Sequence, residues 1–472
     1  MREQPGAPFE GARAVRPWLG LLIVGLGTLL APLDTAVNIA FPSITRAFQL
    51  PLEDIRWVVI AYVLTYASLM LACGRLGDLV GYRPIFQIGL LLTGLGLSTC
   101  AVAPTYPLLL GGRALQGIGI ALTLSCGPAL ATSLLGEAMR TRALAFYAGV
   151  IAIGGALGPI VGGLLVASWD WPAVFFFRVP IAVLALALSP LIAVPAQARS
   201  LRGFDATGAL LLTLWLGALL IAFAALPGSR DASLPLALIG LSLAAFVAVR
   251  WHERRVAEPV IRLALFRDPS FALLNAVNVI ANFAAFGVLL LVPYYLALIR
   301  GLSPAAGGAV LAVSALGTVA GSWLADRLNR RLPLGMLALA GFALNLAGLA
   351  AISTWTEASS LAVIAGSLAV QGTGIGLFQV GYSDYVTGSL PLKDRGVAGS
   401  LTMLTRTVGV VLGATGLSAA FTLLEGTARR GLLPAEAAFV AGFQGTFRAV
   451  ALALAVVLAL SLLHPRLWRL RA

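Results

Sequence analysis

The stretch GRLGDLVGYRPI, residues 74–85, carries Asp78 and Arg83 between two long apolar stretches, 56–73 and 85–104. Each apolar stretch can cross the roughly 30 Å hydrocarbon core of a bilayer as a helix. The glycines between them permit close packing and a tight turn. We therefore predict that residues 74–85 form the turn between two membrane helices.

The rest of the chain repeats this alternation. Of its 472 residues, 59% are hydrophobic and only 11% charged, and the mean hydropathy is +0.95, which indicates a polytopic membrane protein. The apolar stretches are continuous, as in helices, and do not alternate as in β-barrel strands. They fall near 17–42, 56–73, 85–104, 107–128, 143–167, 173–194, 205–226, 234–250, 270–292, 304–325, 334–353, 360–383, 397–422 and 444–463.

The net charge of +13 follows this topology. If every stretch crosses once, most Lys and Arg residues fall on the side of residue 1, including Arg250, Arg254 and Arg255 in one loop and Arg327 in another. Positive charge concentrates in cytosolic loops, so we expect both termini in the cytosol. This distribution explains the basic composition without a nucleic-acid partner.

The chain also resembles itself. At a shift of 255 residues, Gln116-Gly117 aligns with Gln371-Gly372, and Gly154 and Gly158 align with Gly409 and Gly413. We predict an all-α membrane protein with 14 transmembrane helices, as two six-helix bundles and two central helices. The predicted divisions are a cytosolic tail at 1–16, a bundle at 17–194, the central helices and linker at 195–268, a second bundle at 269–464 and a cytosolic tail at 465–472.

Asp34 is the carboxylate that lies deepest inside an apolar stretch, where a charge costs roughly 2.5–3.5 kcal/mol. At 1.5 Å per residue, Asp34 and Arg113 lie about 25 and 21 Å from the cytosolic side, so the two charges can meet. Burial and a nearby arginine act in opposite directions on protonation of a carboxyl group, so a small movement could switch it. We predict that Asp34 and Arg113 couple transport to protons.

Other polar residues in the apolar stretches are weaker candidates. Asn38, four residues after Asp34, is a predicted hydrogen-bond partner of its carboxylate. Hydrogen bonding between helices accounts equally well for the asparagines, and packing for the tyrosine pair. No role is assigned to Arg178, Arg406 or Arg448. The candidate substrate contacts are Asn38, Tyr62, Tyr66, Gln116, Asn275, Asn278, Asn282 and Gln371.

Several motifs resemble those of the major facilitator superfamily. Residues 74–85 match its loop signature at Gly74, Leu76, Asp78, Gly81 and Arg83, which implies charged contacts that hold the cytosolic side closed. The stretch RALQGIGIA (113–121) resembles a signature of its proton-coupled members. The signature of its antiporters is matched at Gly154, Gly158, Pro159, Gly162 and Gly163.

LDTAVNIAFP (33–42) is similar to a pattern of the superfamily's fourteen-span drug:proton antiporter family. WPAVFFFRVP (171–180) resembles that family's sixth helix, with Arg178 in place of a customary Asn and Pro172 in place of a customary Arg. The resemblance covers nearly the whole chain. The two departures bear on the type of substrate.

We therefore expect a proton-coupled transporter, not an enzyme, that exports small amphipathic compounds from a cell, most simply as a monomer in a bacterial inner membrane. One inward proton gains about 3.7 kcal/mol at about 100 mV and one pH unit, enough for roughly a 500-fold gradient of a neutral substrate. Neutral or singly charged compounds are favoured.

The alternatives are an exporter or symporter of a native metabolite or lipid and, in a different class, a membrane-embedded sensor or channel. No phosphate-binding loop of an ATP-driven pump occurs. No cofactor or metal site is expected, because the two histidines, His252 and His464, lie apart and without a ligand cluster.

Overall fold

A computed structural model describes residues 17–136, 139–192, 206–225, 233–256, 266–329, 332–388 and 395–463, and within these ranges all regular structure is helical. The predicted tails and part of the central linker lie outside these ranges. The elements are α1 (Pro17–Leu29), η1 (Pro32–Thr35), α2 (Ala36–Ile39), α3 (Phe41–Ala47), η2 (Leu52–Ile55), α4 (Arg56–Val80), α5 (Tyr82–Ala101), α6 (Tyr106–Leu135), α7 (Arg140–Trp169), α8 (Ala173–Phe176), α9 (Arg178–Leu188), η4 (Ser189–Leu191), α10 (Ala206–Ala225), α11 (Ser233–Glu253), α12 (Pro269–Tyr294), η7 (Tyr295–Ile299), α13 (Pro304–Leu328), α14 (Leu334–Ile352), α15 (Leu361–Gly388), α16 (Arg395–Arg430) and α17 (Ala435–Leu462).

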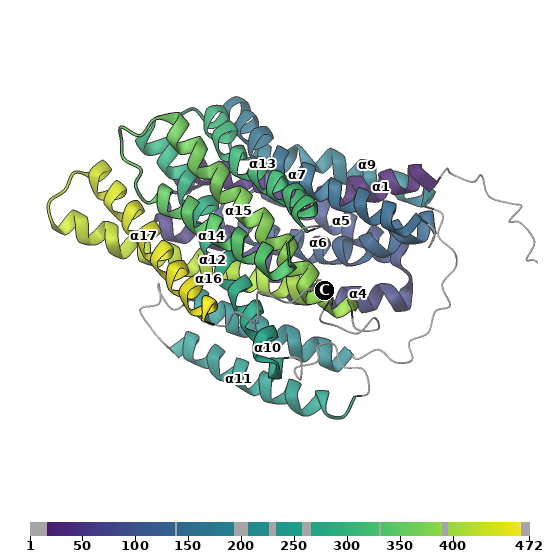
Figure 1. Cartoon of the computed structure of the whole chain (residues 1–472). Helices are drawn as coiled ribbons and strands as arrows, with labels where there is room; N and C mark the ends of the chain where they lie inside the picture. The colour runs from purple at the N-terminus through teal and green to yellow at the C-terminus, as the bar shows by residue number, and fades with distance from the viewer. Residues whose placement is uncertain are drawn as a thin grey trace, which may run out of the picture.

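The helices form two groups that lie side by side, α1 to η4 and α12 to α17, with α10 and α11 at one edge (Figure 1). Twelve helices in the described ranges are long and apolar enough to cross a membrane. The predicted count of fourteen is not confirmed by this criterion. The other two predicted stretches, 56–73 and 205–226, correspond to α4 and α10, and α10 packs on α4, α11 and α16.

The turn predicted at residues 74–85 is much shorter than expected. Helix α4 continues to Val80 and α5 begins at Tyr82, so Gly81 alone separates them. Gly81 has a φ of 104°, a backbone conformation that residues other than glycine rarely adopt. Most of the loop motif is therefore the last two turns of a helix, and its second glycine makes the turn.

The internal repeat is visible in the packing of the helices. A Cβ atom added at Gly96 would lie 2.5 Å from the backbone nitrogen of Gln116, and one added at Gly348 would lie 2.5 Å from that of Gln371. A second pair of glycines relates α5 and α6 to α14 and α15 in the same way. A Cβ atom added at Gly89 would lie 2.8 Å from the carbonyl oxygen of Gly119, and one added at Gly341 would lie 2.8 Å from that of Gly374. Both halves use glycine to bring the same helices together.

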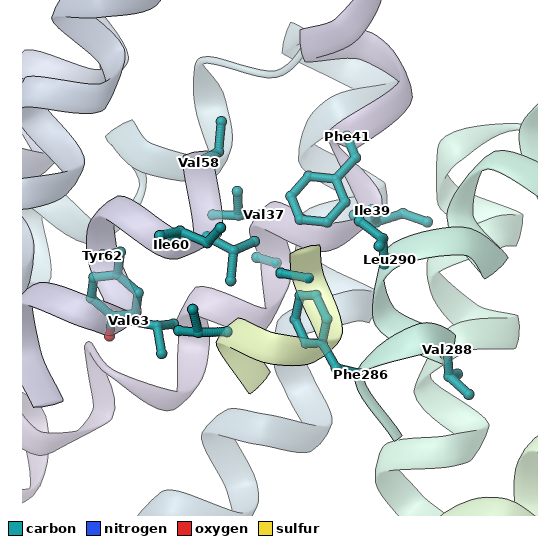
Figure 2. Packing of buried hydrophobic residues seen from close by; sticks show 14 of the residues in the cluster. Val37, Ile39, Phe41, Val58, Ile60, Tyr62, Val63, Phe286, Val288 and Leu290 are labelled. Carbon is teal, nitrogen blue, oxygen red and sulfur yellow. The ribbon is translucent and has the colours of Figure 1, made fainter. Parts of the chain in front are cut away.

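The two halves touch on the side opposite the first residue of α1. Ile39 and Phe41 of the first half lie beside Leu290 of α12 in a continuous apolar cluster (Figure 2). On the same side, the hydroxyl groups of Thr45 and Tyr294 are 2.5 Å apart and hydrogen-bonded. We call these contacts the closed side, because apolar burial joins the halves there.

Candidate functional site

Asp34 lies where the first predicted membrane helix, 17–42, is broken. Helix α1 ends at Leu29, and the chain continues through the short 3-10 segment η1 into α2 and α3. Pro32 begins η1 and has no N–H group for a helical hydrogen bond, which accounts for the break. The Asp34 side chain is 13% exposed, so it is mostly but not fully buried.

Arg113 of α6 holds this carboxylate with two parallel hydrogen bonds. Its Nη1 lies 2.6 Å from Asp34 Oδ1 and its Nη2 lies 2.7 Å from Oδ2. Its Nε donates to the carbonyl oxygen of Val58 and Nη1 also donates to Gln116 Oε1, so each of the three nitrogens is hydrogen-bonded. The guanidinium carbon lies 4.3 Å from the centre of the Tyr62 ring. The predicted meeting of Asp34 and Arg113 is present in the structure.

Arg178, at the start of α9, is a second cation on the same carboxylate. Its Nη1 lies 2.7 Å from Asp34 Oδ1, and its Nε donates to the carbonyl oxygen of Val174. Its Nη2 is buried and has no hydrogen-bond partner in the described residues. Sequence reasoning gave Arg178 no role, although an arginine inside an apolar stretch was a usable signal.

The charges at this site do not balance. Both guanidinium groups are buried, 1% exposed for Arg113 and 0% for Arg178, and among the described ion pairs only Asp34 faces them. Gln116 adds a neutral hydrogen bond, from Nε2 to Asp34 Oδ1 at 3.1 Å. The site therefore carries one excess positive charge while Asp34 is ionised. Protonation of Asp34 would leave two buried cations unpaired, so it requires an arginine to move or water to enter.

The predicted hydrogen bond between Asn38 and Asp34 is wrong. Within the described part of the chain, Asp34 accepts hydrogen bonds from Arg113, Arg178 and Gln116. The helical spacing assumed for Asn38 fails because Asp34 lies in the 3-10 segment η1, whereas Asn38 lies in the next helix, α2. Asn38 is nevertheless buried close by in α2, and a part in substrate binding stays a prediction.

The tyrosine pair is partly at the site. Tyr62 lies against the Arg113 guanidinium group, and Tyr66 packs on Tyr62 with ring centres 5.3 Å apart. Tyr62 is 5% exposed, whereas Tyr66 is half-buried. Of the candidate substrate contacts, Tyr62 and Gln116 therefore contact the ion cluster directly, and Tyr66 borders it.

The glycines of the antiporter motif pack around the break that holds Asp34. A Cβ atom at Gly154 would lie 2.6 Å from the Pro32 side chain, and one at Gly162 would lie 2.7 Å from the carbonyl oxygen of Ala36. A Cβ atom at Gly158 would collide with the Thr35 hydroxyl group. One face of α7 therefore fits closely against the residues on both sides of Asp34.

Pro159 gives this contact a polar link. A proline in a helix leaves the carbonyl oxygen four residues earlier without its usual donor, here that of Gly155. The single hydroxyl hydrogen of Thr35 is shared between the carbonyl oxygen of Pro32 at 2.9 Å and this oxygen at 3.4 Å. The neighbour of Asp34 in sequence is thus tied, by a long hydrogen bond, to the proline kink of α7.

An adjacent face of α7, one residue further along the helix, meets the second half of the molecule. Gly163 lies against Pro304 and Gly308 of α13, and Gly308 lies against the carbonyl oxygen of Pro159. Two glycines thus let the backbones of α7 and α13 touch. Helix α7 connects the break at Asp34 to the contact between the halves.

The loop motif is only partly visible. Arg83 donates from Nη1 to the carbonyl oxygen of Ile192 at 3.4 Å, and Gly74 has ordinary contact with Ser125. The side chain of Asp78 lies outside the described atoms. Closure by charged contacts of this motif stays a prediction.

The polar candidates of the second half form networks away from Asp34. Asn278 donates to Thr405 and accepts from Asn282 and Gln379. Asn275 accepts from Tyr382 at 2.8 Å. Gln371, the counterpart of Gln116, accepts from Ser314 and donates to Asn345. Most of these contacts are hydrogen bonds between helices, one of the two sequence interpretations, and the bond of Asn282 to Asn278 lies within α12. Arg406 and Arg448 are exposed, and Arg448 contacts Gln444.

Two similar helical halves, with a buried ion cluster in the first and a glycine contact of α7 with α13 between them, have the architecture of secondary transporters. The family model described as Major Facilitator Superfamily matches residues 24–414, and the chain belongs to that superfamily.

Similar proteins are named for drug resistance and efflux. The chain is 32% identical over 406 residues to multidrug resistance protein Stp of Mycobacterium tuberculosis, covering 84% of this chain and 74% of that protein. It is 30% identical over 415 residues to the methylenomycin A resistance protein of Streptomyces coelicolor, covering 86% of each. Among solved structures, a bacterial homologue of the lysosomal transporter Spinster has a TM-score of 0.71 at 17% identity, covering 97% of this chain and 98% of that one.

Proposed function

We propose that this protein exports small amphipathic compounds in exchange for protons, by alternating access of one central site. The observation that carries the proposal is the buried carboxylate of Asp34, held by Arg113 and Arg178 where α7 packs against η1 and α2. An ionisable group at this depth is a functional-site hypothesis by default. The names of the similar proteins, which refer to resistance and efflux, support export as the direction.

Asp34 would be the proton carrier, and Arg113 its fixed partner. A proton that neutralises Asp34 removes the charge that holds the arginines, so the cluster can rearrange and the contacts of α7 can change with it. The glycine contact of α7 with α13 provides a surface on which the two halves can rock, and the glycine contact of α7 with α2 links that surface to Asp34. The closed side, with Thr45 and Tyr294, would then open while the other side closes.

The finer topology is part of the proposal. Helices α4 and α10 would also cross the membrane, which gives fourteen spans with 17–194 and 269–464 as the two bundles. Both termini would lie in the cytosol of a bacterial cell, with the protein acting as a monomer in the inner membrane. Its partners would be protons, lipid and small-molecule substrates.

Export by exchange can be tested in everted membrane vesicles that carry an imposed proton gradient. A panel of antibiotics of different charge, with chloramphenicol as an uncharged member, is added while a pH-sensitive dye reports the gradient. Exchange predicts that some compounds collapse the gradient in vesicles containing this protein, with no effect in vesicles lacking it. Compounds that instead increase inward acidification would indicate symport, the metabolite-transport alternative. A gradient unaffected by every compound contradicts proton-coupled export.

A further inference from the structure

We propose that Arg178 sets the charge class of the substrate: the site takes uncharged or anionic amphipathic compounds that present an acceptor oxygen and rejects permanent cations. This inference rests on the proposed export function, because it takes the bound compound to be the one transported. It concerns only which compounds bind, so it can be tested without transport.

The first argument is charge. With Asp34 ionised, Arg113 and Arg178 leave one excess positive charge, and the other hydrogen-bonding groups on the cluster, Gln116 and backbone carbonyls, are neutral. At an effective dielectric constant of about 20, a monocation about 7 Å from this charge would bind roughly 50-fold more weakly than a neutral compound of the same shape. A site with Arg113 alone would be balanced and would not discriminate in this way.

The second argument is the free donor of Arg178. All three nitrogens of Arg113 are bonded, whereas Nη2 of Arg178 is fully buried and has no partner in the described residues. A buried guanidinium donor without an acceptor is unfavourable, so an acceptor oxygen that reached it would be bound strongly.

The third argument is how such an oxygen would reach it. Arg178 holds Asp34 through one nitrogen, and Arg113 holds it through two. The Asp34 side chain is 13% exposed, so a compound can reach part of the residue that joins the two arginines. An acceptor oxygen arriving there can draw Arg178 away while Arg113 keeps Asp34 in place. Arg178 is thus the partner that can exchange.

Aromatic rings around the ion cluster indicate which apolar groups the compound should carry. The Arg178 guanidinium carbon lies 5.6 Å from the centre of the Phe175 ring and 5.9 Å from that of Phe177. The Tyr62 ring lies against the guanidinium group of Arg113. Of these rings Phe177 is partly exposed, and a flat apolar group packs well against such a ring, so the structure favours an aromatic body with one or more oxygen acceptors.

The test is equilibrium binding to the purified full-length protein by calorimetry, corrected for empty detergent micelles. Three probes share a naphthalene ring: 2-acetonaphthone is uncharged with an acceptor oxygen, 2-naphthoate is anionic, and trimethyl(2-naphthyl)ammonium is a permanent cation. We expect the first two to bind and the cation to bind at least about tenfold more weakly. Equal or tighter binding of the cation, or no binding of any probe, overturns the proposal.

Two substitutions separate charge from hydrogen bonding. Arg178→Gln should weaken the two acceptor probes at least about tenfold and should tighten the cation, because the site becomes balanced. Arg178→Lys should keep the rejection of the cation and still weaken the acceptors. Arg448→Gln, which removes an exposed arginine of α17, is the matched control and should change none of the three.

An arginine that only positions Asp34 predicts a different result, namely equal effects of Arg178→Gln on all three probes or none. Either outcome would refute the assigned role. Failure of the proposed export function would show separately, as probes that bind with the expected selectivity but are not exchanged for protons.

Discussion

At the scale of single residues, one carboxylate and two guanidinium groups share one buried site. Asp34 is the sole carboxylate on the cluster in the described structure, and Arg113 and Arg178 both depend on it. Removing one partner of a buried ion pair is costly because it leaves the other charge uncompensated. Here the cost depends on which residue is removed, because Arg178 is in excess.

This imbalance predicts an order of stability. Asp34→Asn leaves two unpaired cations and should destabilise the fold by about 3–5 kcal/mol, whereas Arg178→Gln leaves a balanced pair and should change stability by less than about 1 kcal/mol. The combination of both substitutions should recover part of the loss. Melting temperatures in detergent give the order, and equal losses for the two single variants would contradict the unbalanced charge.

At the scale of helices, the antiporter motif of α7 makes two kinds of contact with the residues beside Asp34. Its glycines fit against the residues that flank Asp34, and Pro159 frees the Gly155 carbonyl oxygen that Thr35 contacts. Helix α6 contains a comparable kink, where Pro128 frees the carbonyl oxygen of Leu124 and Tyr147 donates to it at 3.5 Å. Only the α7 kink lies at the ion cluster and at the crossing with α13.

Replacing the two prolines therefore tests the role of the α7 kink. Pro159→Ala restores a backbone donor to the Gly155 carbonyl oxygen, so it should stabilise α7 by up to about 3 kcal/mol and lower exchange at least about tenfold. Pro128→Ala is the control and should stabilise α6 similarly while keeping most of the activity. Dye-reported exchange in vesicles and melting temperatures measure both effects. Equal loss of exchange in the two variants would show that kinks in general, not this contact, matter.

Some of these elements could be predicted from sequence and others could not. Apolar length and the repeat fix the helices, and depth counting predicts that Asp34 and Arg113 meet, because both quantities depend only on helical rise. Asn38 was misplaced because Asp34 lies in the 3-10 segment η1 and Asn38 lies in α2, so the spacing of one continuous helix does not relate them. Arg178 was missed because its approach to Asp34 depends on how α8 and α9 are oriented, which spacing within one helix does not encode.

At the scale of the whole molecule, the halves are in contact on one side. Ile39, Phe41 and Leu290 are buried there (Figure 2). The Thr45 hydroxyl group is hydrogen-bonded to that of Tyr294 on the same side. Alternating access requires this closed side to separate during each cycle. The hydrogen-bond networks around Asn278 and Gln371 lie within the second half, so they need not break when the two halves move apart.

Bridging the closed side should therefore stop transport. With the native cysteines replaced, Thr45→Cys and Tyr294→Cys joined by a short, reducible thiol-reactive bridge should abolish exchange, and a reducing agent should restore it. Cysteine at either position alone is the control and should respond little to the reagent. Full activity of the bridged protein would mean that this contact persists through the transport cycle.

The most direct measurement concerns Asp34 itself. Purified protein in liposomes is given a proton gradient, and uphill accumulation of the antibiotic that most strongly collapsed the gradient in vesicles is followed for wild type and Asp34→Asn. The Asp34→Asn/Arg178→Gln variant restores the original net charge and guards against instability. We expect wild-type liposomes to accumulate the compound and both variants to carry it only down its own gradient. Uphill accumulation by either variant that an uncoupler still abolishes would place the proton elsewhere and contradict this account.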